Sequence, residues 1–302
     1  MDAHLQPAHQ AQRGLLSLLA SALCWGVLPI YWHALRGLSS PLIIAYRLVF
    51  CCGLVLLWLR IRGELTTVRV ALTTRSTRLR LMASASLIST NWLVYVWAVG
   101  QARVVEASLG YFITPLLNVL LGVLVLRERL RRLQWLAVGL AALGVSYLTL
   151  QTGQPPYVAL ALALSFSAYG LLRKTVPVEA LAGLAAETLL ITPLGVLYVV
   201  WVELQHQGAL TAASPLQLGL LIGAGVVTAM PLWFFAYGAR RISLATVGLV
   251  GYVAPTIQLL VGLYHFDEPF DPHKLVGFTC IWCGLILYSA DAIAALRQTR
   301  NF

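Results

Sequence analysis

Long apolar stretches alternate with short polar segments along the whole chain, and little sequence lies outside them. Each stretch approaches the ~20 residues that an α-helix needs to cross a bilayer. The pattern therefore predicts an all-α integral membrane protein with ten transmembrane helices. The predicted spans are Gly14–Trp32, Leu42–Leu59, Leu81–Gly100, Val104–Leu126, Leu133–Leu150, Tyr157–Leu172, Ala180–Val202, Leu216–Gly238, Leu244–Phe266 and Leu275–Ala290.

A set of residues recurs at about half the length of the chain. With an offset of 140, Pro115, Gly122, Glu128 and Gly144 correspond to Pro255, Gly262, Glu268 and Gly284. With an offset of 144, Ser21, Trp25 and Gly26 correspond to Ser165, Tyr169 and Gly170. Five spans per repeat is an odd number, so the second repeat must enter the membrane in the opposite sense. The sequence thus predicts two inverted five-helix repeats, an organisation typical of transporters.

The boundary between the repeats is expected at 151–156, where "QTGQPP" combines Gly and Pro. The predicted organisation is a cytoplasmic tail over 1–13, a first repeat over 14–150, a second repeat over 157–296 and a C-terminal tail over 297–302.

Composition and charge placement support a membrane location. The chain is 59% hydrophobic and 11% charged, whereas soluble domains carry roughly 25% charged residues. Seventeen of the 21 basic residues fall on one side if the N-terminus is cytoplasmic, and only Arg36, Arg103 and Lys274 fall on the other. The positive-inside rule therefore predicts that both termini are cytoplasmic. The net charge of +10 is interpreted as orientation signals and contacts with anionic lipids, without nucleic-acid binding.

Two ionisable residues lie well inside predicted spans, Arg47 and Glu187, and they are also 140 residues apart. A charge at this depth costs roughly 3 kcal/mol on insertion scales, so it requires a reason. In an inverted repeat, Arg47 lies nearer the outer surface and Glu187 nearer the inner one. Glu106 is the expected partner of Arg47, and Lys174 that of Glu187. Structural ion pairing and a role in gating or substrate contact both remain open.

Pro115 and Pro255 occupy matching positions in the fourth and ninth spans and are expected to interrupt them. The freed carbonyls must face protein or a water-lined cavity, so both prolines are predicted to flank one shared cavity. Kinking for packing alone is the alternative.

Aromatic and amide side chains gather near these positions, which suits a partly apolar organic solute or a cation. They are Trp25, Asn91, Trp92, Tyr95, Tyr111, Asn118, Tyr169, Trp233, Tyr237, Tyr252 and Gln258. Some could instead belong to the interfacial aromatic belt, to which Trp32, Tyr198 and Trp201 are assigned.

Other chemistry has little support in the sequence. Cys280 and Cys283 form C-x-x-C inside a span, without a second pair or a nearby His, and are interpreted as packing residues. No nucleotide-binding loop, zinc motif or nucleophile elbow occurs. No cofactor, metal or enzymatic activity is therefore expected, and the driving force is expected to be a gradient of an ion or of the solute.

The segment "EASLGYFITPLLNVLLGVLVLRERLRRLQWLAV" at 106–138 resembles the RarD family, in the EamA branch of the drug/metabolite transporter superfamily. "CWGVLPIYW" at 24–32, "NWLVYVWAV" at 91–99 and "SFSAYGLLRK" at 165–174 resemble it as well. The resemblance implies ten spans in two inverted repeats, a bacterial inner membrane, and transport of a small solute, in the outward direction. Tyr46, Thr114 and Arg127 depart from residues that are frequent in the family.

The leading hypothesis is a secondary transporter that moves a small organic metabolite or drug-like solute by alternating access. Glu187 would carry any proton coupling, and Arg47 would hold an outer gate or a substrate carboxylate. A non-transporting membrane scaffold is the main alternative, and an intramembrane enzyme is a third. The substrate and the oligomeric state are left open. The predicted substrate path contains Trp25, Arg47, Asn91, Tyr95, Glu106, Tyr111, Pro115, Asn118, Tyr169, Glu187, Tyr237, Tyr252, Pro255 and Gln258.

Overall fold

The computed structural model describes residues 5–126, 131–239, 241 and 250–300, and within these ranges the chain is helical, without strands. The helices are α1 (Leu5–His33), α2 (Ser40–Ile61), α3 (Leu65–Thr73), α4 (Arg75–Gly100), α5 (Val104–Leu126), α6 (Arg132–Thr152), α7 (Tyr157–Thr175), α8 (Ala180–Leu204), α9 (Ala209–Ala212), α10 (Pro215–Ala239), α12 (Val253–Tyr264) and α13 (Pro272–Arg300).

Seven of the described helices are long and apolar enough to cross a membrane: α1, α2, α4, α6, α8, α10 and α13. Helices α7 and α12 are apolar but shorter. Each predicted apolar run overlaps one helix, so the pattern located the elements correctly. Short helices α3 and α9 lie in segments predicted as loops, and the first half of the predicted span 244–266 lies mostly outside the described residues.

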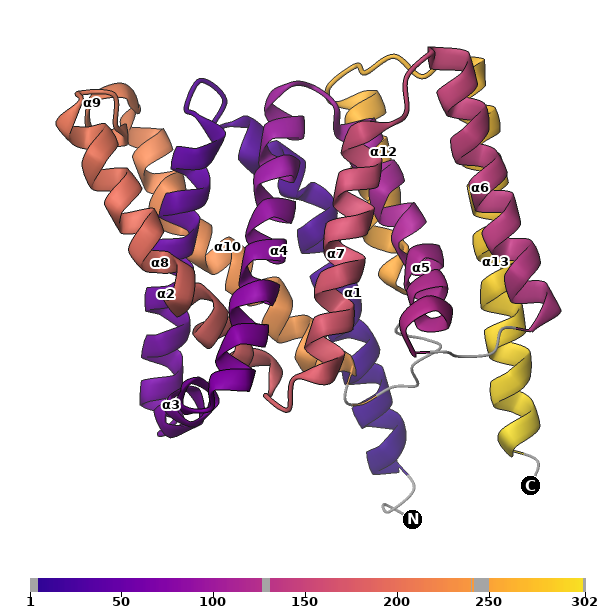
Figure 1. Ribbon diagram of the computed structural model, residues 1–302, viewed down its shortest axis with the longest axis horizontal. Coiled ribbons are helices and arrows are strands. Elements are labelled where there is room, and N and C mark those ends of the chain that lie inside the picture. Colours follow the sequence, from indigo (N-terminus) through magenta and orange to yellow (C-terminus); the bar gives the residue numbers. More distant parts are fainter. Residues whose placement is uncertain (1–4, 127–130, 240, 242–249, 301–302) are drawn as a thin grey trace.

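The connections lie at the two ends of a helical bundle. Both ends of the described chain and α3 lie at one end of the molecule, whereas α9 and the α12–α13 connection lie at the other (Figure 1). The basic segment 60–80 thus shares an end with both termini.

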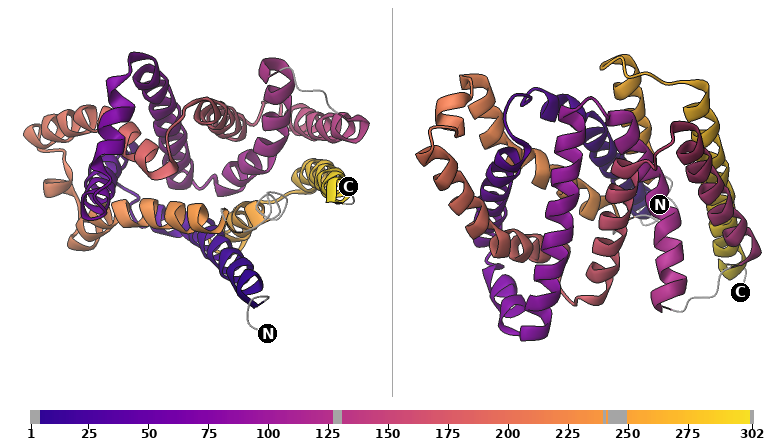
Figure 2. Two further views of the ribbon diagram at one scale, coloured as in Figure 1. Left: turned by 90° about the horizontal axis from the view of Figure 1, so that it is seen from below. Right: turned by 45° about the horizontal axis from the view of Figure 1, so that its top comes forward.

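Eight helices pack in a closed cyclic order: α1, α10, α2, α8, α4, α7, α5, α12 and back to α1. Helices from the N-terminal and C-terminal halves of the chain alternate at every step of this order. The remaining long helices, α6 and α13, pack mainly on each other and lie side by side at one edge of the molecule (Figures 1 and 2).

Close backbone contacts join α6 and α13 at two reciprocal points. A Cβ added to Gly144 would lie 2.7 Å from the carbonyl oxygen of Gly277, and one added to Gly284 would lie 2.7 Å from that of Ala137. Because lipid tails are as apolar as the side chains, membrane helices associate through such close packing. Glycine at both points lets the two backbones meet.

The prolines behave differently from each other. Helix α5 continues through Pro115, so the prediction that this residue interrupts its span was wrong. A helix can tolerate proline when the freed carbonyl and the local bend are accommodated by neighbouring groups. Pro255 lies in the first turn of α12, where a missing N–H is harmless, and a turn at Tyr252 precedes it.

Candidate functional site

The guanidinium of Arg47 lies inside the bundle against two indole rings. Its Cζ is 3.9 Å from the ring centroid of Trp92 on α4 and 4.9 Å from that of Trp32 on α1. Arg47 retains 5% of its accessible surface. Cation–π contacts of roughly 2 kcal/mol each in a desolvated site offset part of the cost of burying the charge.

The predicted partner of Arg47 was wrong. Glu106 instead pairs with Arg103, with Nη2 and Oε2 2.6 Å apart, and accepts the backbone N–H of Val158 at 2.9 Å. Among the described residues, no carboxylate lies within 4.0 Å of the Arg47 guanidinium, and its buried Nε makes no hydrogen bond. Glu106 pairs with Arg103, three residues earlier and just before the start of α5, instead of reaching Arg47.

Trp32 was also assigned wrongly, since it is 1% exposed and lies in the core rather than in an interfacial belt. Its position near the end of α1 suggested the interface, but the adjoining connection covers that end: Leu35 is fully buried. Trp201, in contrast, is exposed.

A series of aromatic rings leads from this region towards α7. Tyr95 and Tyr111 have ring centroids 5.8 Å apart, and Tyr111 and Phe166 6.2 Å apart. Phe166 and Tyr169 follow at 6.0 Å. The Tyr95 hydroxyl is buried and has no hydrogen-bond partner. We call Tyr95, Tyr111, Phe166 and Tyr169 the aromatic file.

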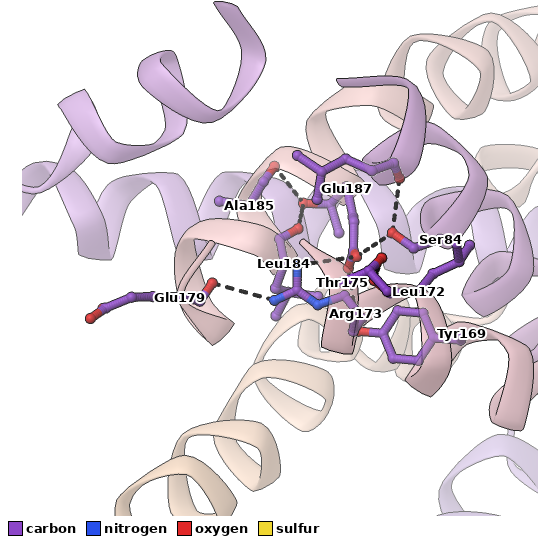
Figure 3. A network of polar contacts seen from close by, with 11 residues as sticks. Ser84, Tyr169, Leu172, Arg173, Thr175, Glu179, Leu184, Ala185 and Glu187 are labelled. Atoms are coloured by element: carbon purple, nitrogen blue, oxygen red, sulfur yellow. Dashed lines mark hydrogen bonds and ion pairs between the residues drawn. The ribbon is translucent and has the colours of Figure 1, made fainter. Parts of the chain in front are cut away.

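Glu187 lies at the far end of the aromatic file, in a polar cluster between α4, α7 and α8 (Figure 3). Ser84 donates to its Oε1 at 2.6 Å and Tyr169 to its Oε2 at 3.4 Å. Arg173 Nη1 lies 3.6 Å from Oε1. Glu187 is 1% exposed. The side chain of Lys174, the predicted partner, lies outside the described residues, and Arg173 provides the cation.

Asn91 and Gln258 hold helices together. Asn91 Nδ2 donates to the Leu162 carbonyl and to Ser165 Oγ, both at 3.0 Å, and Tyr111 donates to its Oδ1 at 3.5 Å. Gln258 Nε2 donates to the Trp25 carbonyl at 3.0 Å, which joins α12 to α1. The Oε1 atom of Gln258 is buried without a hydrogen bond.

The other predicted residues lie in different surroundings. Tyr237 stacks under Arg241, whose Cζ is 3.5 Å from the ring centroid. Tyr252 packs with the core around α5, α6 and α13. Asn118 is exposed on α5. The structure therefore brings Asn91, Tyr95, Tyr111, Tyr169 and Glu187 into one connected group. Arg47 joins this group through electrostatic interactions with Tyr95 and Tyr111, whereas several predicted members lie outside it.

This group can support recognition and proton exchange. A buried cation flanked by rings can hold an anionic or π-rich group. A buried carboxylate that accepts bonds from Ser84 and Tyr169 can change its protonation as its surroundings change. Among the described residues, no group of three or more His, Cys, Asp or Glu could hold a metal ion.

Comparison with known proteins identifies the family. The profile of the EamA-like transporter family matches residues 12–150 and again 156–290. This chain belongs to the EamA-like transporter family. It is 39% identical over 300 residues to a protein named RarD from Streptomyces exfoliatus, with 98% of this chain and 94% of that one covered. It is 41% identical over 297 residues to the uncharacterized transporter YojE of Bacillus subtilis, with 97% and 98% covered. These matches place the EamA chain in the RarD group of the drug/metabolite transporter superfamily.

A solved crystal structure shares the fold of this EamA chain. The TM-score is 0.58 at 18% sequence identity, with 91% of this chain and 96% of the other covered. Together with the apolar helices, the family membership identifies a multi-pass membrane protein from a family of transporters.

Two of the residues that depart from the RarD pattern have local partners. The Tyr46 hydroxyl donates to Glu203 Oε1 at 3.4 Å, and Thr114 Oγ1 donates to the Gly110 carbonyl at 3.0 Å. Arg127 lies outside the described residues. Sequence reasoning did not single out Ser84, Phe166 or Arg173, although Arg173 adjoins the predicted Lys174. Ser84 is one of several hydroxyl residues in its span, so nothing in the sequence distinguished it.

Proposed function

We propose that this EamA-family chain is a secondary transporter that moves a small organic solute across the bacterial inner membrane by alternating access. In this proposal, ten spans form two inverted five-helix repeats with both termini cytoplasmic. The observation that carries the proposal is the reciprocal packing of the two halves.

Exchanging the halves leaves the packing order unchanged. If α1, α2, α4, α5 and α6 are exchanged with α7, α8, α10, α12 and α13, every neighbouring pair in the cyclic order becomes a neighbouring pair again, and α2 with α8 and α5 with α12 map onto themselves. For example, α1 with α10 becomes α7 with α4. Such an exchange is the property expected of two repeats related by a pseudo-two-fold axis.

The same exchange relates individual contacts. Gly144 against Gly277 becomes Gly284 against Ala137 under the offset of 140. Ser21 Oγ donates to the Pro231 carbonyl at 2.8 Å, and its equivalent Ser165 Oγ accepts from Asn91, the equivalent of Pro231, at 3.0 Å. The family profile also matches the chain twice, once per half.

The charged sites then fall where two gates would operate. Arg47 lies on α2 and Glu187 at the equivalent position of α8, and these helices pack on each other. The aromatic file runs from Tyr95, on the Arg47 side, to Tyr169, which contacts Glu187. Each half would close one end of the path while the other opens, with Arg47 and the Glu187 cluster biasing opposite gates.

Reconstituted flux tests the proposal directly. Purified protein in liposomes is expected to move at least one member of a metabolite and drug panel faster than empty liposomes, and to respond to an imposed proton gradient. A protein of native stability without flux for any solute in the panel would favour the non-transporting scaffold.

A further inference from the structure

Arg47 is a deeply buried cation that the described protein leaves without a counter-charge. We propose that the substrate supplies this charge: the solute bound at Arg47 carries a carboxylate on a partly apolar organic body. This inference rests on the proposed transport function and names the substrate class of the same site.

Buried and half-buried carboxylates elsewhere in the bundle are already engaged. Glu106 pairs with Arg103, and Glu187 with Arg173. Glu268 accepts the backbone N–H groups of Val104 and Val105 at 2.6 and 2.8 Å. An isolated charge in a low-dielectric interior is unfavourable unless it is paired and hydrogen-bonded. Because the described carboxylates do not fill this role, an incoming anion would.

The geometry around Arg47 suits a carboxylate. The rings of Trp92 and Trp32 attract the guanidinium electrostatically, whereas its planar fork of N–H donors matches the two oxygens of a carboxylate. The buried Nε has no acceptor, and neither does the buried hydroxyl of Tyr95, which could donate. A carboxylate has two oxygens that accept parallel bonds from a guanidinium in a bidentate pair.

The apolar part of the proposed ligand follows from the aromatic file. Tyr95 makes a ring contact with Tyr111, which in turn contacts Phe166. Such rings stabilise a flat or apolar ligand by packing against it, and they interact only weakly with a small inorganic anion. The site therefore combines one cationic anchor with an apolar wall, which is the pattern of a small-molecule site.

Direct binding tests this assignment separately from transport. Full-length protein in lipid nanodiscs is titrated by calorimetry at neutral pH with matched sets: benzoate, benzamide and benzylamine, then hexanoate, hexanamide and hexylamine. Sodium chloride and inorganic phosphate are titrated alone, and empty nanodiscs serve as blanks. At least one carboxylate is expected to bind about tenfold or more tighter than its amide and amine, as a charge-assisted bidentate pair would give.

Substitutions then assign the effect to Arg47. Arg47→Gln is expected to weaken carboxylate binding at least about tenfold, and Arg47→Lys to an intermediate degree because it keeps charge without the planar fork. Tyr95→Phe, which removes one oxygen, should weaken it roughly threefold to tenfold. Arg69→Gln, an exposed site on α3, is the matched control and should bind normally.

Several results would overturn the assignment. They are equal binding of carboxylate and amide in both sets, no binding of either carboxylate, saturation by chloride or phosphate alone, or undiminished binding in a folded Tyr95→Phe and Arg47→Lys. The same panel in liposomes separates the two ideas. Carboxylate binding without flux would refute transport but support the anion site. Flux without a preference for carboxylates would support transport but refute the anion site.

Discussion

Glu187 is held by three side chains that come from two neighbouring helices. Ser84, on α4, and Tyr169 and Arg173, on α7, all contact its carboxylate, so relative movement of α4, α7 and α8 would change these contacts together. A carboxylate whose partners depend on conformation can take up and release a proton during a transport cycle.

Replacing Glu187 with Gln should therefore abolish the dependence of flux on the proton gradient while the protein remains folded. Glutamine keeps an oxygen that can accept from Ser84 but cannot titrate. Flux in liposomes with and without an imposed proton gradient measures the effect. Glu64→Gln is the control, because Glu64 lies in the segment after α2 and is paired with Arg62 at 3.8 Å. Proton-driven flux that persists at the native rate in Glu187→Gln would return Glu187 to a structural role.

At this scale the sequence predicted that Arg47 and Glu187 are buried but not what they contact. Arg47 and Glu187 were found because charge is rare inside apolar spans and because they share the repeat offset. Their surroundings depend on how helices are rotated and which neighbours they meet, and one sequence does not determine that. Glu106 was therefore assigned to Arg47 although Arg103 was nearer along the chain, and Trp32 was placed in the membrane interface.

Among the elements, the α12–α13 connection has an unexpected structural role. Glu268 was recognised in the sequence only as the repeat equivalent of Glu128, without a contact of its own. It is 8% exposed and accepts the backbone N–H groups of Val104 and Val105. Because the first N–H groups of a helix have no partner within it, this carboxylate satisfies the start of α5. The connection thus fastens one half of the chain to the other.

Burial raises the pKa of Glu268 above its ordinary value of 4.5, and its two backbone N–H bonds and Lys274 oppose that shift. A raised folded-state pKa means that the folded protein binds the proton more tightly. The associated stability is complete below the ordinary pKa and is lost as pH rises through the raised one. Glu268→Gln should remove this pH dependence, because glutamine is neutral at every pH and cannot titrate.

Thermal unfolding of both proteins in detergent, measured from acid to neutral pH, checks this expectation for Glu268. The difference between their melting temperatures should change across the range just above the ordinary pKa. A constant difference over the whole range would contradict the raised pKa, and Glu179→Gln on the opposite end of the bundle provides a comparison for general charge effects.

The α6–α13 contact yields a matched pair of substitutions. Gly144→Ala and Gly284→Ala each place a methyl group 2.7 Å from a backbone carbonyl, so the helices must separate. Each should destabilise the protein by about 1–3 kcal/mol, as overpacking does. Gly139→Ala on the same helix is the control, because an added Cβ there meets nothing within 4 Å. Unfolding in detergent measures all three, and equal stability of Gly144→Ala and Gly139→Ala would refute the close contact.

Element positions were predictable because a bilayer imposes length and apolarity on whatever crosses it. Features governed by local contacts were not. Proline was expected to interrupt α5, whereas the helix continues through Pro115. Helices α3 and α9 are short and lie in polar connections, where no apolar run marks them. Gly144 and Gly284 were recognised as a repeat, but their partners Gly277 and Ala137 required the structure.

For the molecule as a whole, the proposed topology makes opposite predictions for the two ends of the bundle. In a variant without native cysteines, single cysteines at Thr73 and Thr175 should be protected from an impermeant reagent in intact cells. Cysteines at Gln101 and Gln205 should react, and all four positions are exposed at helix ends or turns. Labelling of lysed cells confirms reactivity. The reverse pattern in either half would refute the inverted arrangement for that half.

The alternation of halves around the eight-helix order bears on how the chain is made. Each first-half helix in this order, α1, α2, α4 and α5, packs between two helices of the second half. During synthesis the first half is therefore inserted before its packing partners have been made. Biogenesis must therefore pass through an intermediate in which the first half is inserted but not yet packed, and neither half should be stable alone. Separate genes for residues 1–153 and 154–302 should yield stable protein only when expressed together, as judged by protease resistance in membranes and restored flux. Persistence of either fragment by itself would indicate independently folding halves.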